Sequence, residues 1–207
     1  MRIERLHLIM VRHGETEANR RGLALGRADL PLNEIGRKQA IQIAAALAAE
    51  PIVAVYCSPL ARAMATAGPI AAVHHLPVDI DPALIEMDIG ELDGLTFPQV
   101  RERYPGLLEL WTSAEGPREA MPGGECLQDV QGRATEALRL IAQRHADATA
   151  CVVTHNFVIL SLLAHVLRID LAGFRRLRHN VAAITTLELS RDRWRLVRLN
   201  DGCHLRD

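Results

Sequence analysis

Residues 8–16 read Leu-Ile-Met-Val-Arg-His-Gly-Glu-Thr, and this stretch decides the fold. The apolar residues 8–11 predict a short buried strand, which ends abruptly at Arg12, His13 and Gly14. In open α/β sheets, ligands bind just beyond the carboxyl ends of the strands. A histidine at that point is either structural or part of a site, and its partners elsewhere in the chain decide between the two.

Segments that predict strands and helices alternate along the rest of the chain. The predicted strands lie at 52–57, 78–80, 150–154, 182–189 and 194–199, and the predicted helices at 34–49, 59–73, 98–104, 125–144 and 157–167. This alternation predicts an α/β fold, a three-layer α/β/α sandwich with a mostly parallel central sheet. At 207 residues the chain is expected to form a single domain over residues 1–207.

Local signals refine this outline. Asn33 and Ser58 predict helix N-caps, the latter because Pro59 follows it directly. Residues 15–31 and 105–124 show no clean period and predict irregular structure. A polar turn at 190–193 is expected to join the last two strands.

The composition disfavours several classes of protein. A formal net charge of −1 is unlike that of a general nucleic-acid binder, which carries a surplus of basic residues. The four cysteines form no CxxC pair, so neither a zinc knuckle nor a disulfide framework is expected. The apolar helix at 157–167 is too short to span a bilayer, and charged residues interrupt the first apolar run. We therefore expect a cytoplasmic protein with no membrane contact.

Polar side chains follow three of the predicted strands. They are Arg12 and His13 after the first strand, Ser58 and Arg62 after the second, and His155 and Asn156 after the strand at 150–154. Because parallel strands present their carboxyl ends at one edge of a sheet, we expect these groups to converge there. Glu86, in an acidic loop after residues 78–80, can reach the same edge.

This set of side chains describes an anion site with acid/base groups. Arginine forks match phosphate oxygens, and a neutral imidazole can attack phosphorus while a second histidine donates to the developing charge. Glu86 can supply a proton to the leaving alcohol if its surroundings keep it protonated. Since fixed cations take the part that Mg²⁺ would play, no metal and no other cofactor is expected.

Several motifs occur in one order along most of the chain. They are Arg12-His-Gly-Glu-Thr16 with Asn19, Gly26-Arg-Ala-Asp-Leu-Pro-Leu32, Ser58-Pro-Leu-Ala-Arg62-Ala-Met-Ala-Thr-Ala67, Leu84-Ile-Glu86 through Gly94, Pro122-Gly-Gly-Glu125 and Val153-Thr-His155. In this order they resemble the histidine phosphatase superfamily, in its phosphoglycerate mutase-like branch. The resemblance implies that His13 becomes a phosphohistidine. It also implies that Arg12, Arg62 and His155 form the phosphate pocket, with Asn19 helping to position the phosphoryl group.

The resemblance also assigns residues outside the phosphate pocket. Glu86 would protonate the leaving oxygen and later activate water. Asn156 departs from the family pattern, which commonly has Gly there, and an Asn can add a side-chain contact to phosphate. His204 in the tail is expected near the cleft, and Arg27 is interpreted as a solvated loop residue in preference to a substrate contact.

Together these expectations describe a metal-independent phosphomonoesterase of the histidine acid type, acting on a small-molecule phosphate ester. A phosphoglycerate mutase is the first alternative, but the resemblance implies a longer insertion for mutases, and the interval 94–122 is short. A non-catalytic phospho-ligand binder is the second, and retention of every expected catalytic side chain speaks against it.

The substrate itself is left open by the sequence. Its binding wall is expected from residues 22–27 and 97–121, the latter within a variable capping region around 95–124. Leu23, Met87, Tyr104 and Trp111 are the expected apolar contacts. The terminal strands offer an edge at which a homodimer could pair.

Overall fold

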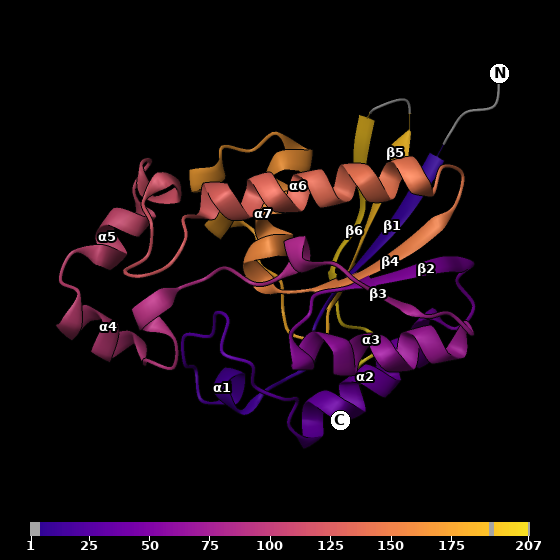
Figure 1. Cartoon of the computed structure of the whole chain (residues 1–207), viewed down its shortest axis with the longest axis horizontal. Helices are drawn as coiled ribbons and strands as arrows, with labels where there is room; N and C mark the ends of the chain where they lie inside the picture. The colour runs from indigo at the N-terminus through magenta and orange to yellow at the C-terminus, as the bar shows by residue number, and fades with distance from the viewer. Residues whose placement is uncertain (1–4, 191–192, 207) are drawn as a thin grey trace.

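A six-stranded sheet in the order β3-β2-β4-β1-β5-β6 forms the centre of the protein (Figure 1). This computed structural model describes residues 5–190 and 193–206. The strands are β1 (Arg5–Arg12), β2 (Ile52–Cys57), β3 (Val78–Ile80), β4 (Thr149–Thr154), β5 (Ile184–Ser190) and β6 (Arg193–Asp201). β1, β4, β2 and β3 are parallel, whereas β5 pairs antiparallel with both β1 and β6. The predicted mostly parallel sheet is confirmed.

Helices cover both faces of this sheet. α2 (Glu34–Leu47) and α3 (Ala61–Val73) lie on one side, and α6 (Leu127–Arg144) and α7 (Asn156–Leu167) on the other (Figure 1). Alternate strand residues point to opposite faces. In β1, Ile9 and Val11 therefore pack into the core beneath α2 and α3, while Leu8 and Met10 pack into the core beneath α6 and α7. The predicted three-layer α/β/α sandwich is confirmed.

The start of α3 differs from the prediction. Asn33 caps α2 as expected, since its side chain accepts a hydrogen bond from the Gly36 N–H at 2.8 Å. Ser58, however, is not the cap of α3: the helix begins at Ala61 and its N-cap is Leu60. The Ser58 hydroxyl is instead engaged by His155, a contact between residues 97 positions apart that local sequence does not encode.

The expected irregular segments contain short helices. α1 (Glu17–Arg20) lies in the segment 15–31, and the predicted helix at 98–104 is α4 (Phe97–Arg103). The segment 105–124 holds α5 (Leu107–Thr112) and a 3₁₀ turn at Gly116–Arg118, so its irregular assignment is partly wrong. α5 starts at Gly106, whose φ of 81° places it in the left-handed region, without a capping side chain. α4 and α5 project away from the sheet at one end of the molecule (Figure 1).

Three further 3₁₀ turns complete the chain, at Pro82–Leu84, Gly90–Leu92 and Leu171–Arg176. The predicted turn at 190–193 includes residues 191–192, which lie outside the described part. Within the described residues, no helix combines the length and the apolar character needed to cross a membrane.

Candidate active site

The parallel pairing of β1 and β4 brings two histidines together. Arg12 lies opposite Thr154 in the strand register, so the residues that follow them, His13 and His155, leave the sheet side by side. Their ring centroids are 5.1 Å apart. Arg62 comes from the first turn of α3, after the neighbouring strand β2. The sheet edge thus gathers side chains from three separate parts of the sequence.

His13 is held as a neutral imidazole with a defined proton. It is 2% exposed, and its Nδ1 lies 2.7 Å from the Gly14 carbonyl oxygen. Because a carbonyl can only accept a hydrogen bond, Nδ1 carries the proton and Nε2 keeps its lone pair. Burial first, and then the charges of Arg12 and Arg62, hold the pKa of His13 well below its usual value. A neutral imidazole with a free Nε2 is a competent nucleophile.

His155 contacts a hydroxyl group through one ring nitrogen and, within the described part of the chain, leaves the other ring nitrogen without a partner. Its Nε2 lies 2.7 Å from the Ser58 hydroxyl, which itself accepts the Leu60 N–H at 3.3 Å. The Ser58 hydroxyl can donate to Nε2 as well as accept from it, and when it donates, the ring proton of His155 lies on Nδ1. This Nδ1 is buried and has no acceptor among the described residues. Burial, followed by the neighbouring His13 and Arg62, lowers the pKa of His155 well below its usual value.

The two arginines are fixed at their terminal nitrogens and unpaired at Nε. Arg62 is fully buried and donates to the carbonyl oxygens of Gly26 and Ala28, each at 2.7 Å. Arg12 donates to the Asn156 Oδ1 at 3.1 Å and to the backbone oxygen of His179. Within the described residues, neither Nε has an acceptor, although both are buried. Buried donors without partners are rare in folded proteins, and these fit an anion.

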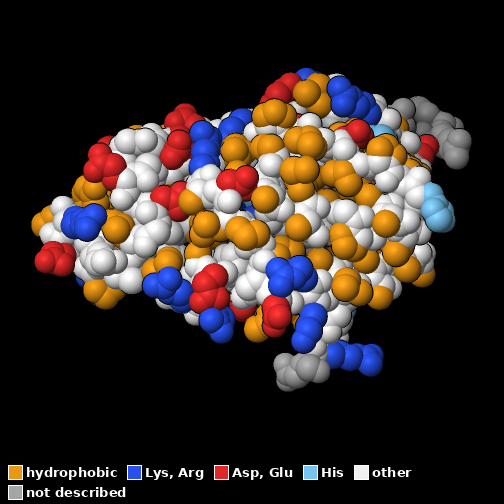
Figure 2. Space-filling view, turned by 60° about the horizontal axis from the view of Figure 1, so that its bottom comes forward, with side chains coloured by type: hydrophobic (Ala, Val, Ile, Leu, Met, Phe, Trp, Pro, Cys, Tyr) orange, Lys and Arg blue, Asp and Glu red, His pale blue; other side chains and the backbone are white. Residues whose placement is uncertain are grey.

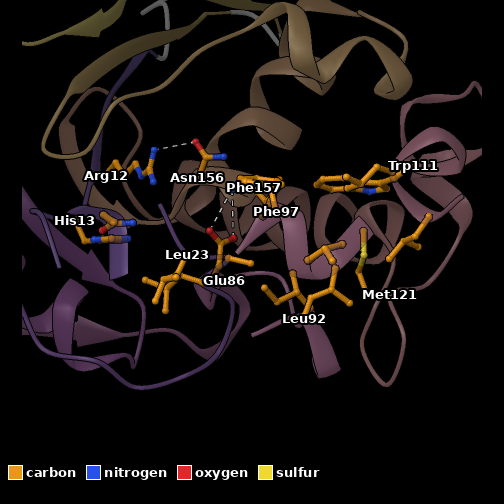
Figure 3. A pocket seen from close by; sticks show the side chains of 17 residues that line it. Arg12, His13, Leu23, Glu86, Leu92, Phe97, Trp111, Met121, Asn156 and Phe157 are labelled. Atoms are coloured by element: carbon orange, nitrogen blue, oxygen red, sulfur yellow. Dashed lines mark hydrogen bonds between the residues drawn. The ribbon is translucent and has the colours of Figure 1, made fainter. Parts of the chain in front are cut away.

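Glu86 is a buried carboxyl group on the opposite side of the same space. It is 3% exposed, and its Oε1 accepts from the N–H groups of Met87 at 2.8 Å and Phe157 at 3.2 Å (Figure 3). Burial raises the pKa of Glu86, and the Met87 N–H and the two arginines offset part of that effect. Glu86 is therefore easier to protonate than an exposed glutamate.

A network that the sequence analysis missed holds the Glu86 loop. Arg133 of α6 donates to the backbone oxygens of Ala83, Ile85 and Glu86 and pairs with Glu125 at 2.8 Å. Arg27 also pairs with Glu125, at 3.0 Å, and with Asp88 at 3.4 Å. The interpretation of Arg27 as a merely solvated residue was therefore wrong. Contacts to backbone carbonyls leave no sequence pattern, so only the Pro-Gly-Gly-Glu motif pointed toward this network, through Glu125.

A cavity of about 230 Å³ opens beside these groups. Its polar end is lined by Arg12, His13, Asn19, Glu86 and Asn156, whereas Arg62 and His155 lie fully buried and do not line it. Its other end is apolar and includes Leu92, Phe97, Trp111, Met121 and Phe157, whereas Leu23 lies near His13 and Glu86 (Figure 3). Two of the expected apolar contacts, Leu23 and Trp111, are on the wall. Met87 is instead fully buried in the core, and Tyr104 donates to Glu91.

The remaining residues singled out from the sequence have structural contacts. Asn19 uses its Oδ1 to bond the backbone N–H and hydroxyl of Thr16, which leaves its Nδ2 free of these bonds. Asn156 braces Arg12. His204 bonds the Ala182 carbonyl at 3.0 Å, and the Ala182 N–H in turn donates to the His13 backbone oxygen. His204 is thus linked to the His13 backbone through Ala182 and does not line the cavity. Among residues 5–190 and 193–206, no cluster of three or more His, Cys, Asp or Glu residues has the arrangement of a metal site.

Comparison with known proteins agrees with this geometry. Residues 8–202 match the profile of the histidine phosphatase superfamily (branch 1). The chain is 33% identical over 198 residues to phosphoserine phosphatase 1 of Hydrogenobacter thermophilus, covering 96% of this chain and 93% of that protein. It is 34% identical over 200 residues to a metal-independent phosphoserine phosphatase of Arabidopsis thaliana, covering 96% and 82%.

A solved structure shares the fold of this chain. The YhfR protein of Bacillus stearothermophilus superposes with a TM-score of 0.90 at 29% identity, over 96% of this chain and 98% of that one. The profile match spans most of the chain and includes every motif that carries the buried arginines, histidines and glutamate. The chain belongs to the histidine phosphatase superfamily, branch 1.

Proposed function

We propose that this phosphoric monoester hydrolase cleaves small phosphorylated metabolites without a metal ion, through a phosphohistidine on His13. The observation that carries the proposal is the state of His13: it is neutral, with Nε2 unprotonated, next to two buried arginines whose Nε groups lack acceptors. The relatives named as phosphoserine phosphatases support hydrolysis as the reaction.

In the first step, the Nε2 lone pair of His13 attacks phosphorus and the bond to the leaving oxygen breaks. Glu86 gives its proton to that oxygen, so the alcohol departs neutral. The positive charge on the phosphorylated ring is stabilised by the Gly14 carbonyl, which accepts from Nδ1. The Nε groups of Arg12 and Arg62 and the Nδ1 of His155 bond the phosphoryl oxygens as their charge increases. Asn19 Nδ2 and Asn156, which both line the cavity, add contacts to the same oxygens.

In the second step, water attacks the phosphorus atom. The Glu86 carboxylate takes a proton from this water while the P–N bond breaks. Inorganic phosphate and the neutral His13 result, and Glu86 is protonated again for the next cycle. No additional acid or base is needed, and the fixed cations supply the charge stabilisation.

The capping region around 95–124 fits a role in covering the leaving group. α4 and α5 contribute Phe97 and Trp111 to the cavity wall. Among the described residues, the cavity wall offers no second cluster of cations to hold a carboxylate while a phosphoryl group is moved between two positions of one substrate. This favours water over a retained alcohol as the final acceptor, and so hydrolysis over a mutase reaction.

The direct test is phosphate release from a panel of phosphomonoesters, in the presence and absence of a chelator. We expect equal rates in both conditions, and an acid-labile phosphate on the wild-type protein that His13→Ala lacks. Formation of 2-phosphoglycerate from 3-phosphoglycerate without phosphate release would support the mutase instead. A folded His13→Ala protein with near wild-type turnover would refute the mechanism.

Cellular setting and assembly complete the proposal. The cysteines Cys57, Cys126, Cys151 and Cys203 are all free thiols, which fits a cytoplasmic enzyme. For a homodimer, β6 offers an edge strand, and the apolar face over α2 and α3, with Ile35, Ile41 and Met64 exposed, offers a second contact (Figure 2). Light scattering after size exclusion distinguishes a dimer from a monomer.

A further inference from the structure

The end of the cavity farther from His13 is built almost entirely from apolar side chains. Leu92 and Met121 come from loops packed against the core, and Phe97 and Trp111 come from α4 and α5 (Figure 3). Among the described residues that line the cavity, the charged side chains are Arg12 and Glu86, and both are at the reacting end. The part that receives the leaving group therefore carries no fixed charge.

The aromatic part of this wall is closely packed. The Trp111 ring lies edge-on against Phe157 at 5.3 Å and tilted against Phe174 at 5.5 Å, measured between ring centroids. The Arg175 guanidinium covers Trp111 at 4.8 Å from the ring centroid, a cation–π contact that fixes the indole from the outside. These contacts hold the Trp111 ring in place at the cavity wall.

Burial against this apolar wall has opposite energetic effects on charged and on apolar leaving groups. Phosphoserine carries an ammonium and a carboxylate on the leaving group, and phosphoglycerate carries a carboxylate. The wall offers these charges the Trp111 Nε1–H, which has no acceptor among the described residues, but no charged side chain to neutralise them. An apolar leaving group instead gains free energy from burial. The volume is sufficient, because about 230 Å³ exceeds the roughly 150 Å³ of an apolar protein cavity known to accept benzene.

Resting on the proposed phosphatase function, we propose that the preferred substrates are phosphate monoesters of uncharged, apolar alcohols or phenols. The apolar group sits against Phe97, Trp111 and Phe157, with the phosphate at His13. The reaction is the one described above: the P–O bond breaks, and the apolar alcohol leaves with the proton of Glu86. This substrate class differs from that named for the phosphoserine phosphatase relatives, although the reacting groups are shared.

The test uses primary alkyl esters, whose leaving groups differ little in acidity. We would measure kcat/KM for ethyl, butyl, hexyl and 2-phenylethyl phosphate, together with O-phosphoserine and 3-phosphoglycerate. Burial of one methylene is equivalent to about a fourfold gain in kcat/KM, so hexyl phosphate should exceed ethyl phosphate by on the order of 10²-fold. O-Phosphoserine and 3-phosphoglycerate should lie at or below ethyl phosphate.

Two variants, one on the cavity wall and one beside it, test whether the wall causes the preference for longer alkyl chains. Phe97 is 55% exposed, so Phe97→Ser should fold, and we expect it to lower the hexyl-to-ethyl ratio of kcat/KM about tenfold. Leu110 on α5 is also partly exposed but does not line the cavity, so Leu110→Ser is the matched control and should leave that ratio unchanged. Equal ratios in Phe97→Ser and wild type would overturn the assignment of the wall.

The series also separates failure of this inference from failure of the proposed function. If no ester releases phosphate, both the proposed phosphatase function and the apolar preference are refuted. If the esters are hydrolysed but kcat/KM does not rise with chain length, or is highest for O-phosphoserine, the apolar preference alone is overturned. A strong preference for a leaving group with a distal carboxylate would likewise overturn it, and would move recognition to Arg175 and Arg178 in the adjoining outer groove.

Discussion

Replacing Glu86 by Gln tests the role of the buried carboxyl group with little change of shape. The amide oxygen can still accept from the N–H groups of Met87 and Phe157, so the loop should keep its position. What is lost is the proton that the carboxyl group transfers. General acid catalysis contributes a factor on the order of 10² to 10⁴, and because Glu86 is buried from water, no solvent proton replaces it. We expect a loss of about 10³-fold on alkyl phosphates, or about 4 kcal/mol in activation free energy.

The identity of the leaving group decides whether this interpretation is right. Phenolates such as 4-nitrophenolate leave without a proton, so their first turnover in Glu86→Gln should slow by no more than about tenfold. The second step still needs Glu86 as a base, so the variant should release a burst of nitrophenol equal to the enzyme concentration and then slow. Rapid-mixing measurement of nitrophenol, and of alcohol from hexyl phosphate, gives both first-turnover rates.

A matched control and the pH dependence complete this test. Glu91 lies in the same loop, is exposed, and does not line the cavity, so Glu91→Gln should change neither rate by more than about twofold. Because burial raises the pKa of Glu86, kcat/KM for alkyl esters should fall as pH rises through that pKa, and Glu86→Gln should lack this fall. An equal loss on alkyl and aryl esters would refute the assignment of Glu86 as the proton donor.

The other predictions concern the arginines and a buried histidine. Arg62→Ala should lower kcat by on the order of 10²-fold or more on all esters, since it removes a fixed donor to the transition state; steady-state kinetics on a protein shown to be folded by circular dichroism test this. Arg133→Met should lower alkyl-ester turnover about tenfold and displace the alkaline limb of the pH profile, because the Glu86 loop loses its backbone bonds. Arg139→Met on the exposed side of α6 is its control and should behave as wild type. Burial, with a smaller contribution from Arg12, lowers the pKa of His179 to about 4. As pH falls, this histidine therefore binds a proton in the unfolded chain before it does so in the folded protein. The free energy of unfolding should therefore drop by up to about 3 kcal/mol between pH 6.5 and 4, and urea titrations of His179→Asn should show a smaller drop.

The sequence predicted the sheet and the large helices because their residues follow clear periods. The strand at 52–57 matches β2, and the helix at 59–73 ends at the same residue as α3. α5 was missed because Gly106 starts it without a capping side chain, so no local signal marks it. Ser58 was assigned as a cap because its neighbour Pro59 is typical of helix starts, but a tertiary contact to His155 competes for its hydroxyl.

The site also combines features that local sequence predicts with features that depend on tertiary contacts. Side chains that directly follow strands, such as His13 and His155, could be predicted to converge because sheet geometry alone brings them together. Arg133 could not, since it lies 47 positions from Glu86 and acts on backbone oxygens, which every residue carries. The residues of the apolar wall could be predicted only in part. Leu23 and Trp111 were named as contacts, whereas Phe157 of α7 meets Trp111 of α5 through a tertiary contact, 5.3 Å between ring centroids, that no local pattern encodes.

In the proposed mechanism, burial acts on His13 and Glu86 in the same sense and suits them to opposite roles. Removal from water favours the neutral form of each group, so it lowers the pKa of the His13 imidazole and raises the pKa of the Glu86 carboxyl group. The buried arginines help only the first, since their charge disfavours imidazolium but favours carboxylate. Glu86 thus depends on exclusion of water to stay protonated against Arg12 and Arg62. An apolar leaving group on the wall next to Glu86 would exclude more water and raise its pKa further, so substrate preference and proton donation are coupled by the same desolvation.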